Sequence, residues 1–449
     1  MHVKVIIVGA GEVGLASAQA AKKDNDVLII DKDPARTENA KNSLQVSVLR
    51  EDGSNPNVLK GAIERVSADL IIAAVSDDAV CLFICMEAKR IKPSIRTIAC
   101  VRDSDYVIGN DVADLILSPS DIIADKIIRL TYMENAIAYD HLSGGLCLAT
   151  FRISDGQNAV GKTVMSADLP EGCTVMAIHR GSTVITDVDT ADLRAGDRVC
   201  VLGMQGAMDE VNEKIGVRKE AREVVILSAG NLAIRVAKAL LAMQERFFVK
   251  IIDSDLEACR NAAKRLREAI VVNGNPVDPV FLKSENVDRA DVIITVSDMD
   301  ERNLLASMTA LRFGIRKIIS IYTLEDYDGI FRYAGIESVV GYRSVIANEI
   351  YRTILMEIEG KDTGYTKMEI PGDYLLRTEI ARDMPVRGKY VGDVTYPEGV
   401  RLAAIIREGK MILPRLSDVF KEGDTAVLFV NKPNALRLSH LFGNRITEP

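Results

Sequence analysis

The sequence predicts an α/β protein with two doubly wound parallel-sheet domains, each followed by a small α+β domain rich in strands. Three observations predict this. Short runs of Val and Ile alternate with amphipathic segments, a glycine-rich turn follows the first run, and the whole pattern returns about 220 residues later. Near-continuous apolar runs separated by helices are typical of parallel sheets covered on both faces.

The second half of the chain repeats the first at a nearly constant distance. The glycine-rich turns and the acids after the second strands recur at offsets of about 219 and 222 residues. The pattern Gly-Lys followed by Pro-Glu-Gly recurs at about 227. The paired positions are Gly11 and Gly230, Asp31 and Asp253, and Gly161 and Gly388. The domain order is therefore large, small, large, small.

Length and composition fit a multidomain chain that is not membrane-spanning. The 449 residues are enough for several compact domains, and apolar runs end well before the roughly 18 residues of a membrane span. The first strand begins so near Met1 that we expect no signal peptide. Seven cysteines without a CxxC pair indicate reduced thiols in a cytosolic protein, and a net charge of -8 argues against nonspecific nucleic-acid binding.

The elements of the first large domain follow from the apolar runs. We predict strands near 3–9, 26–31, 46–50, 69–75, 96–101 and 114–117. The segment 120–133 has apolar residues at helical spacing, and 344–358 is its counterpart in the second half. Each of these terminal helices either crosses to a neighbouring domain or is an ordinary core helix.

The small domains are predicted from short strands separated by glycine-containing turns, such as Arg180-Gly181-Ser182. The charged run 213–223 is the expected linker between the halves, and 360–364 is the expected boundary within the second half. The predicted domains are 1–136, 137–217, 218–362 and 363–449.

The glycine-rich turn carries the first chemical signal. It reads Gly9-Ala10-Gly11-Glu12-Val13-Gly14, between a predicted strand and a predicted helix. The first glycine permits the tight turn, the second lets the backbone approach a pyrophosphate, and the third lets helix and strand pack closely. The helix N-terminus offers unpaired N–H groups to the anion. The first large domain is therefore predicted to be a Rossmann-like nucleotide-binding domain.

Asp31 follows the second strand at the spacing expected of a carboxylate that binds ribose. A carboxylate accepts hydrogen bonds from free ribose hydroxyls but repels a 2′-phosphate, so NAD(H), ATP or ADP fit better than NADP(H). Lys32 and Arg36 could meet a phosphate, or they belong to a solvated turn and helix start.

Two further polar segments follow strands three and four, at the edge where open α/β sheets bind ligands. They contain Asp52 and Gly53 in the first case and Ser76 in the second. Asp52 has turn chemistry as its alternative role, and Ser76 has helix N-capping.

The second large domain has an eroded loop. Ser228 and Ala233 replace the first and third glycines, which makes pyrophosphate binding less favourable. Asp253 is kept at the end of the second strand, so a weaker or different nucleotide remains an alternative for this domain.

The sequence offers little for catalysis. A dehydrogenase needs a proton donor or acceptor beside its nicotinamide. None of the four histidines is placed in the sequence to face a nicotinamide bound at the first loop; they are His2, His141, His179 and His440. No nucleophile elbow, HExxH helix or Walker A loop is present. Cys81 and Cys85 are predicted to be core residues rather than metal ligands. We therefore predict no enzyme, with an NAD-dependent oxidoreductase as the weaker alternative.

The tandem arrangement resembles the TrkA-type regulatory subunits of microbial potassium uptake, which are built from tandem regulator-of-potassium-conductance (RCK) domains. The resemblance covers essentially the whole chain. It rests on the glycine loop with 30–34, on 52–54, 76–78 and 101–103, and on the small-domain segments 160–163, 169–172 and 193–199.

The resemblance implies a cytoplasmic protein attached to the inner face of the membrane through a Trk-type potassium-translocating subunit, which it gates as a ring, expected to be a homotetramer. It implies that Gly9, Gly11 and Gly14 meet phosphates, Asp31 the ribose, Asp52 and Ser76 the base or ribose edge, and Arg102 a phosphate. Two positions depart from the family pattern, Cys100 where an arginine is common and Val80 where an asparagine is. A nucleotide sensor for another transporter or channel is the nearest alternative.

Overall fold

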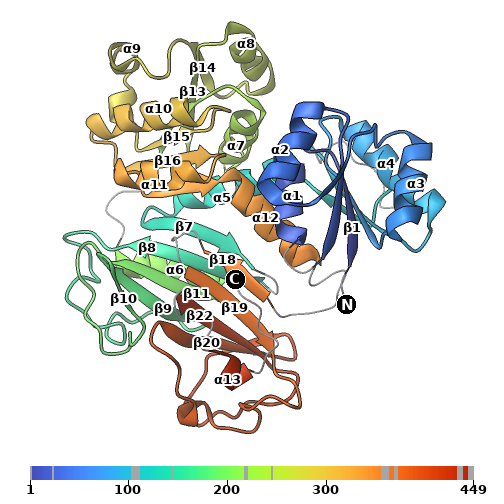
Figure 1. Ribbon diagram of the computed structural model, residues 1–449. Helices are drawn as coiled ribbons and strands as arrows, with labels where there is room; N and C mark the ends of the chain where they lie inside the picture. Colours follow the sequence, from blue (N-terminus) through green and yellow to red (C-terminus); the bar gives the residue numbers. More distant parts are fainter. Residues whose placement is uncertain are drawn as a thin grey trace. The chain divides into compact units, whose positions relative to one another are not determined.

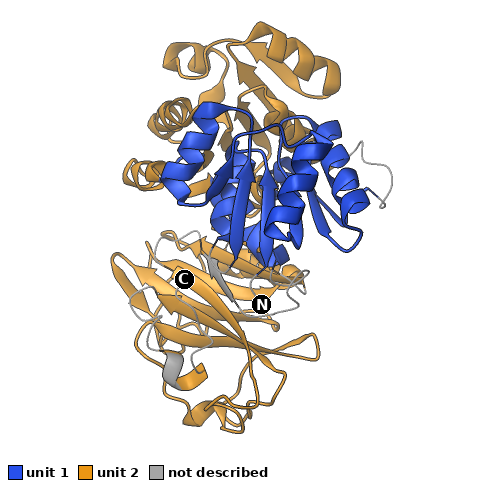
Figure 2. Ribbon diagram, turned by 45° about the vertical axis from the view of Figure 1, so that its right-hand side comes forward, with its two compact units in different colours: residues 1–125, 323–325, 341–360 blue, residues 126–322, 326–340, 361–449 orange. Residues whose placement is uncertain are grey.

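The computed structural model describes residues 3–22, 25–102, 112–142, 145–216, 221–243, 246–354, 364–368, 373–431 and 438–442. The chain forms two compact units (Figure 2). Unit 1 contains residues 1–125, 323–325 and 341–360, and unit 2 contains 126–322, 326–340 and 361–449. Over the described ranges, no helix combines the length and the apolar character that crossing a bilayer requires.

Unit 1 is built on a six-stranded parallel sheet in the order β3-β2-β1-β4-β5-β6. The strands are β1 (Lys4–Val8), β2 (Asp26–Ile30), β3 (Ser47–Leu49), β4 (Leu70–Ala73), β5 (Arg96–Cys100) and β6 (Leu115–Leu117). The helices between them are α1 (Glu12–Ala21), α2 (Pro34–Leu44), α3 (Pro56–Val66) and α4 (Asp78–Ile91). The strand order reverses between β1 and β4, which is where open α/β sheets form a ligand crevice.

Alternation along the strands builds a core on each face of this sheet. Val5 and Ile7 of β1 pack in one core with residues of α1, while Ile6 and Val8 pack in the other with residues of α3 and α4. Successive strand side chains point to opposite faces, so the run of Val and Ile covers both.

The helix that follows the second parallel sheet belongs to unit 1. α12 (Tyr342–Thr353) packs along α1, and Ile346, Ile350 and Ile354 join the α1 core (Figure 1). The crossing alternative is therefore confirmed for this helix, and residues 355–358 of its predicted range lie outside the described residues. The first terminal helix, α5 (Pro119–Tyr132), begins in unit 1 and continues in unit 2.

The first small domain is a five-stranded antiparallel sheet in the order β10-β9-β11-β8-β7. Its elements are β7 (Ala136–His141), β8 (Leu146–Arg152), β9 (Cys173–Arg180), β10 (Thr183–Ile185), β11 (Arg198–Met204) and α6 (Gln205–Ile215). The expected linker 213–223 begins in α6 and ends at the next strand, with 217–220 outside the described residues.

The second parallel sheet repeats the first in the order β14-β13-β12-β15-β16-β17. Its strands are β12 (Glu223–Leu227), β13 (Phe248–Asp253), β14 (Ile270–Asn273), β15 (Val292–Thr295), β16 (Lys317–Tyr322) and β17 (Ser338–Gly341). Its helices are α7 (Asn231–Leu241), α8 (Leu256–Arg265), α9 (Pro279–Ser284), the short 3-10 helix Val287–Arg289, α10 (Asp300–Arg312) and α11 (Asp326–Tyr333).

The second small domain has the order β18-β19-β22-β20-β21, which is the topology of the first small domain. Its elements are β18 (Gly364–Lys367), β19 (Asp373–Glu379), the 3-10 turn Val391–Asp393, β20 (Val400–Arg407), β21 (Lys410–Ile412), β22 (Thr425–Asn431) and α13 (Ser439–Phe442). The expected boundary at 360–364 lies almost wholly outside the described residues. Two parallel sheets, each followed by a small antiparallel one, confirm the predicted fold class.

The two small sheets share one buried core within unit 2, and they contact each other through β9 and β20. Each sheet also carries the same clamp, in which a half-buried arginine donates to a buried aspartate 17 residues later. Arg180 donates to Asp197 at 2.9 and 2.8 Å, and Arg407 donates to Asp424 at 2.7 Å through both nitrogens. The clamps confirm the offset of 227 between the small domains.

Candidate nucleotide-binding site

The turn after β1 is tight and packs closely against its surroundings, as predicted from its first and third glycines. Gly9 adopts φ +108, and its N–H donates to the carbonyl of Ile30 at 2.8 Å. A Cβ at Gly9 would lie 2.3 Å from the carbonyl oxygen of Ala74, and one at Gly14 would lie 1.9 Å from the carbonyl oxygen of Gly9. A side chain at Gly9 would therefore clash with the backbone that follows β4, and one at Gly14 would force α1 away from the turn.

Gly11 has a different role because it faces open space. It is the N-cap of α1, no side chain caps the helix there, and a Cβ would meet no heavy atom within 4 Å. The N–H groups of the first turn are thus left for a ligand, and the helix dipole favours an anion at this end. Ala10 and Val13 complete this turn between the buried end of β1 and the first turn of α1.

Glu12, the acidic residue of the turn, forms an ion pair with Arg343 of α12. Both residues belong to unit 1, although they are 331 positions apart in the chain. Sequence reasoning missed Arg343, because no local signal links a helix after the second sheet to the first glycine loop. The ion pair connects the loop to the helix that packs along α1.

Asp31 is half-buried at the end of β2 and is bonded to the loop. One carboxylate oxygen accepts from the N–H of Ala10 at 2.7 Å, and the other accepts from the N–H of Asp33 at 2.8 Å. Each carboxylate oxygen has a second lone pair, so hydroxyl donors can still be accepted. The neighbouring Lys32 is exposed and lies 3.6 Å from a carboxylate oxygen of Asp52, while Arg36 is exposed on the first turn of α2.

Asp52 shows the turn chemistry that was its alternative role. One oxygen accepts from the N–H of Ser54 at 3.0 Å and from its hydroxyl at 2.6 Å. These bonds to Ser54 are the main cause that lowers the pKa of the Asp52 carboxyl. Gly53 is required by packing, since a Cβ there would lie 2.4 Å from a methyl of Val8. The second oxygen of Asp52 remains at the exposed edge beside Lys32.

Ser76 and Arg102 follow β4 and β5 at the same edge of the sheet. Ser76 is exposed and does not cap a helix, because Asp77 is the N-cap of α4 and accepts from the N–H of Val80 at 3.2 Å. Arg102 is 64% exposed at its side chain, with Nε 3.6 Å from Asp78. The N-capping alternative for Ser76 is thus wrong, while Asp103 of the 101–103 segment lies outside the described residues.

In the second glycine loop a side chain bonds one backbone N–H group of the turn, although α7 has no side-chain cap, as α1 has none. Ser228 is not among the described residues with positive φ, and its hydroxyl accepts from the N–H of Gly230 at 3.2 Å. The N–H that corresponds to that of Gly11 is therefore already bonded. Ala233 is fully buried where the first loop has Gly14.

Asp253 repeats the loop bonds of Asp31 but is more deeply buried. Its carboxylate accepts from the N–H of Ala229 at 2.7 Å and from that of Asp255 at 2.9 Å, and it is only 8% exposed. The carboxylate at this position is thus sufficiently explained by its part in holding the loop. Nothing in this geometry adds support for a ligand at the second loop.

A polar cleft of about 580 Å³ lies within unit 2, between the first small domain and the second parallel sheet. Its lining includes Glu134, Arg152, Lys317 and Glu337. Lys317 is buried and donates to the carbonyl of Ala136, and burial lowers its pKa to about 7, against the opposing effect of Glu134 and Glu337. No sequence pattern marks this cleft.

Cys81 and Cys85 are fully buried in the core of unit 1, as predicted. Desolvation raises the pKa of the Cys81 thiol to about 11 and that of Cys85 to about 12, so both are protonated and unreactive at neutral pH. Neither belongs to a potential metal-binding group in the described part of the chain. His141 and His179 lie on strands of the first small domain, and the side chains of His2 and His440 are outside the described residues.

Comparison with known families gives two pairs of matches in alternation. The TrkA-N domain matches residues 5–119 and 224–341, and the TrkA-C domain matches 148–216 and 375–443. Together these segments cover most of the chain, and they follow the large, small, large, small order of the repeat.

Full-length relatives show the same organisation. The chain is 29% identical over 440 residues to the Trk system potassium uptake protein TrkA homolog 1 of Methanosarcina mazei. The alignment covers 95% of this chain and 97% of that protein. It is 27% identical over 448 residues to the TrkA homolog of Archaeoglobus fulgidus, covering 98% and 100%. Among solved structures, the GsuK channel bound to NAD superposes with a TM-score of 0.63 at 16% identity, over 99% of this chain and 80% of that chain. At this identity, the structural likeness shows a shared fold.

Proposed function

The chain belongs to the TrkA family of proteins with tandem TrkA-N and TrkA-C domains, and from this premise we propose that it is a nucleotide-sensing regulator of a Trk-type potassium-translocating membrane subunit. Membership places it in a regulatory family rather than a catalytic one. The observation that carries the proposal is the first glycine loop, where α1 has an uncapped N-terminus, open space faces Gly11 and Asp31 adjoins the turn.

The ligand of this site is NAD(H), ATP or ADP. The N–H groups at the start of α1 bind its phosphates, with Gly9, Gly11 and Gly14 shaping the turn. Asp31 accepts the ribose hydroxyls through its remaining lone pairs and disfavours a 2′-phosphate. The structure of a fold relative bound to NAD supports a nucleotide as the class of ligand.

Side chains along the edge of the sheet complete this site in the proposal. Ser76 is exposed beside the loop and contacts the base or ribose edge. Arg102 is exposed after β5 and contacts a phosphate. Asp52 contributes its second oxygen, and Lys32 neutralises that carboxylate when no ligand is present.

The second loop is silent for nucleotide in this proposal. Ser228 bonds the N–H of Gly230, and the carboxylate of Asp253 is buried. The four domains proposed at 1–136, 137–217, 218–362 and 363–449 therefore include one sensing domain, one scaffold domain and two assembly domains. The four segments that match the TrkA-N and TrkA-C families each lie within one of these domains, which supports the proposed division.

The response passes from the loop to α12. A ligand shifts a conformational equilibrium only through its different affinities for the two states, and such coupling amounts to about 1 to 3 kcal/mol. Phosphates that bind at the start of α1 compete with Glu12 for positive charge and change its ion pair with Arg343. Because α12 packs along α1, the change is carried to the helix that leads toward the second small domain.

The protein acts as a ring of tandem chains on the cytoplasmic side of its membrane partner, with four chains as the expected number. Relatives named as Trk system potassium uptake proteins support the identity of that partner. Light scattering of the purified chain gives the number of chains.

Calorimetric titration of the purified chain with NAD⁺, NADH, NADPH, ATP and ADP tests the sensing step. We expect one site per chain and tighter binding of the nucleotides without a 2′-phosphate. A preference for NADPH would contradict the role of Asp31, and the absence of binding would leave the first loop as a purely structural turn. Potassium flux through proteoliposomes with the Trk-type subunit, with and without nucleotide, then tests the gating step.

A further inference from the structure

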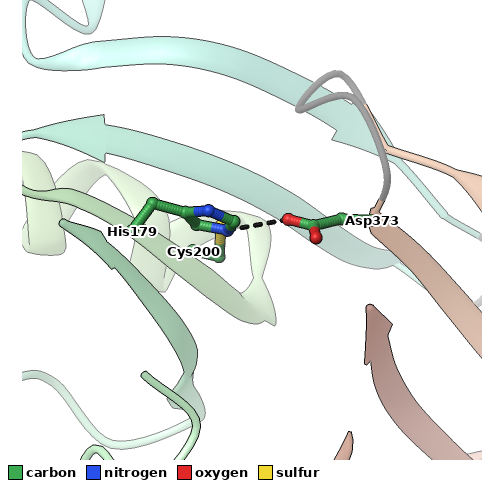
Figure 3. Close-up of side chains that lie close together, drawn as sticks. All are labelled: His179, Cys200 and Asp373. Carbon is green, nitrogen blue, oxygen red and sulfur yellow. Dashed lines mark ion pairs between the residues drawn. The ribbon is translucent and has the colours of Figure 1, made fainter. Parts of the chain in front are cut away.

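Three buried polar side chains meet where the two small sheets share their core (Figure 3). His179 lies on β9 and Cys200 on β11 of the first small domain, while Asp373 begins β19 of the second. They are 5%, 0% and 0% exposed, and one nitrogen, one sulfur and one carboxylate oxygen lie within 4.8 Å of one another.

Two of these atoms lack a satisfactory partner. Nε2 of His179 and Oδ2 of Asp373 are 2.7 Å apart, but they are not aligned as donor and acceptor, and neither makes another hydrogen bond with the described residues. The other oxygen of Asp373 accepts from Nδ2 of Asn431 at 2.9 Å. Buried polar atoms are nearly always paired, so an unpartnered nitrogen and an unpartnered oxygen that lie this close together require a physical explanation.

The repeat shows that the fold does not need polar residues here. The offset of 227 that relates the two clamps pairs His179 with Ile406, Cys200 with Val427 and Leu146 with Asp373. Ile406, Val427 and Leu146 belong to the shared apolar core. One set of three equivalent positions in the shared core is thus apolar, and the other set carries an imidazole, a thiol and a carboxylate.

We propose that His179, Cys200 and Asp373 bind a zinc ion that joins the two small domains of one chain. Imidazole nitrogen, thiolate sulfur and carboxylate oxygen are the three side-chain ligand types that zinc takes in proteins. A zinc ion would be coordinated by both unpartnered atoms, so that no hydrogen bond between them is needed. Asn431 holds the second oxygen of Asp373 and so orients the carboxylate, as partners of metal ligands commonly do.

The geometry requires only a small adjustment. Zinc bonds of about 2.0 to 2.3 Å in a tetrahedral site hold a nitrogen and an oxygen about 3.3 Å apart. The pair His179 and Asp373 therefore opens by roughly half an ångström to admit the ion. The hydroxyl of Thr150 lies 3.5 Å from the sulfur of Cys200 and can donate a hydrogen bond to it.

This site is independent of nucleotide binding, because its ligands come from the small domains and not from the glycine loop. It extends the proposed function by giving the assembly domains their own ligand. A metal that bridges β9, β11 and β19 ties together parts of the chain that are almost 200 residues apart in sequence, and therefore stabilises the folded state over the unfolded one.

Zinc titration of the full, untagged chain tests the proposal. Protein stripped with chelator is dialysed against zinc, and bound metal is measured by mass spectrometry. The matched control is the triple variant His179→Ile, Cys200→Val and Asp373→Leu. It replaces each proposed ligand by the apolar residue found at the equivalent position of the repeat. We expect one zinc per chain in the natural protein and none in the control, with a higher unfolding temperature on zinc addition only in the former.

Cobalt substitution separates this site from adventitious surface binding. Bound Co²⁺ should give the near-ultraviolet absorption of a thiolate ligand, and Cys200→Ser should remove that band. Equal zinc content in the natural chain and a folded triple variant, or cobalt binding without the thiolate band, would overturn the proposal. Nucleotide titration of the triple variant is expected to match the natural chain, so failure of the zinc site and failure of the nucleotide site are distinguishable.

Discussion

The two parallel-sheet domains have the same strand order but differ in the backbone and hydrogen bonds of the glycine loop. In the first, Gly9 has positive φ and the N-cap Gly11 faces open space. In the second, the hydroxyl of Ser228 bonds the N–H of Gly230. The comparison teaches that the turn can change while the sheet around it keeps its strand order, because one serine takes up a backbone N–H of the second loop.

The requirement for glycine at the third position of the loop depends on the conformation of the first. The carbonyl oxygen of Gly9 lies where a Cβ on Gly14 would be, so the positive φ at the first position excludes a side chain at the third. In the second loop Ser228 lacks positive φ, and Ala233 fits with its methyl buried. Once the first glycine is replaced, the constraint on the third is relieved.

The largest expected effect comes from placing a charge in the open space. Gly11→Asp puts a carboxylate where phosphates would bind, and we expect nucleotide affinity to fall more than about 100-fold, since like charges at the helix N-terminus repel. Folding should be retained because a Cβ at Gly11 meets no heavy atom within 4 Å. Calorimetry measures the loss, and circular dichroism checks the fold.

Gly230→Asp is the matched control in the second loop. It should leave nucleotide affinity unchanged if that loop is silent. A fall in the number of bound nucleotides per chain would break the comparison and assign a site to the second domain.

The next largest effect distinguishes the two aspartates. Asp31→Asn keeps the size of the side chain but removes its charge, and we expect NADH affinity to fall about 10- to 100-fold, in line with the value of hydrogen bonds to charged groups. Discrimination against NADPH should weaken as well. Asp253→Asn should leave nucleotide affinity unchanged and lower stability by about 1 to 3 kcal/mol, because its carboxylate holds a buried loop. Chemical unfolding with parallel calorimetry separates these results.

The third effect is the pH dependence of stability that comes from a buried lysine at the start of a strand. Lys317 begins β16 and is buried, whereas Arg96, its counterpart in the first domain, begins β5 and is exposed. Burial lowers the pKa of Lys317 to about 7 from its ordinary 10.5, so between these values the unfolded chain binds one more proton than the folded chain. This lysine therefore makes stability rise with pH across that window, by about 1.5 kcal/mol from pH 7 to 8.5.

Lys317→Met should remove this slope and raise stability near neutral pH. The measurement is the free energy of unfolding of both proteins at pH 7 and 8.5. The buried cysteines ionise in the unfolded chain near pH 8.5, but they contribute equally to both proteins and cancel in the difference between the two slopes. Parallel slopes in the two proteins would show that Lys317 is charged in the folded state. Arg96→Met is the control, with no expected change in slope.

The smallest effect sharpens the link between loop and helix. Arg343→Gln removes the ion pair with Glu12, which is partly exposed, and we expect stability to change by no more than about 1 kcal/mol. Nucleotide affinity should change less than about threefold, while the nucleotide dependence of potassium flux should decrease. Unchanged regulation of flux would exclude the ion pair from the response.

The fold and the first loop could be predicted from sequence because their signals are local. The glycine spacing, the acid after β2 and the runs of Val and Ile each lie within a short window, and the repeat doubles every observation. The partnership of Glu12 with Arg343 could not be predicted, since it depends on which helix covers α1. The meeting of His179, Cys200 and Asp373 also depends on the packing of two small sheets, and none of the three is unusual in its own segment.

The position of α12 has a consequence for the linkage between the two halves. A chain of half this length would possess α1 but would have to recruit a second molecule to cover it, and the contact would then strengthen or fail with protein concentration. In the tandem chain the covering helix is tethered to the domain it covers, so its effective concentration is set by the linker and not by the amount of protein in the cell. Dilution that dissociates neighbouring chains should therefore leave α1 covered.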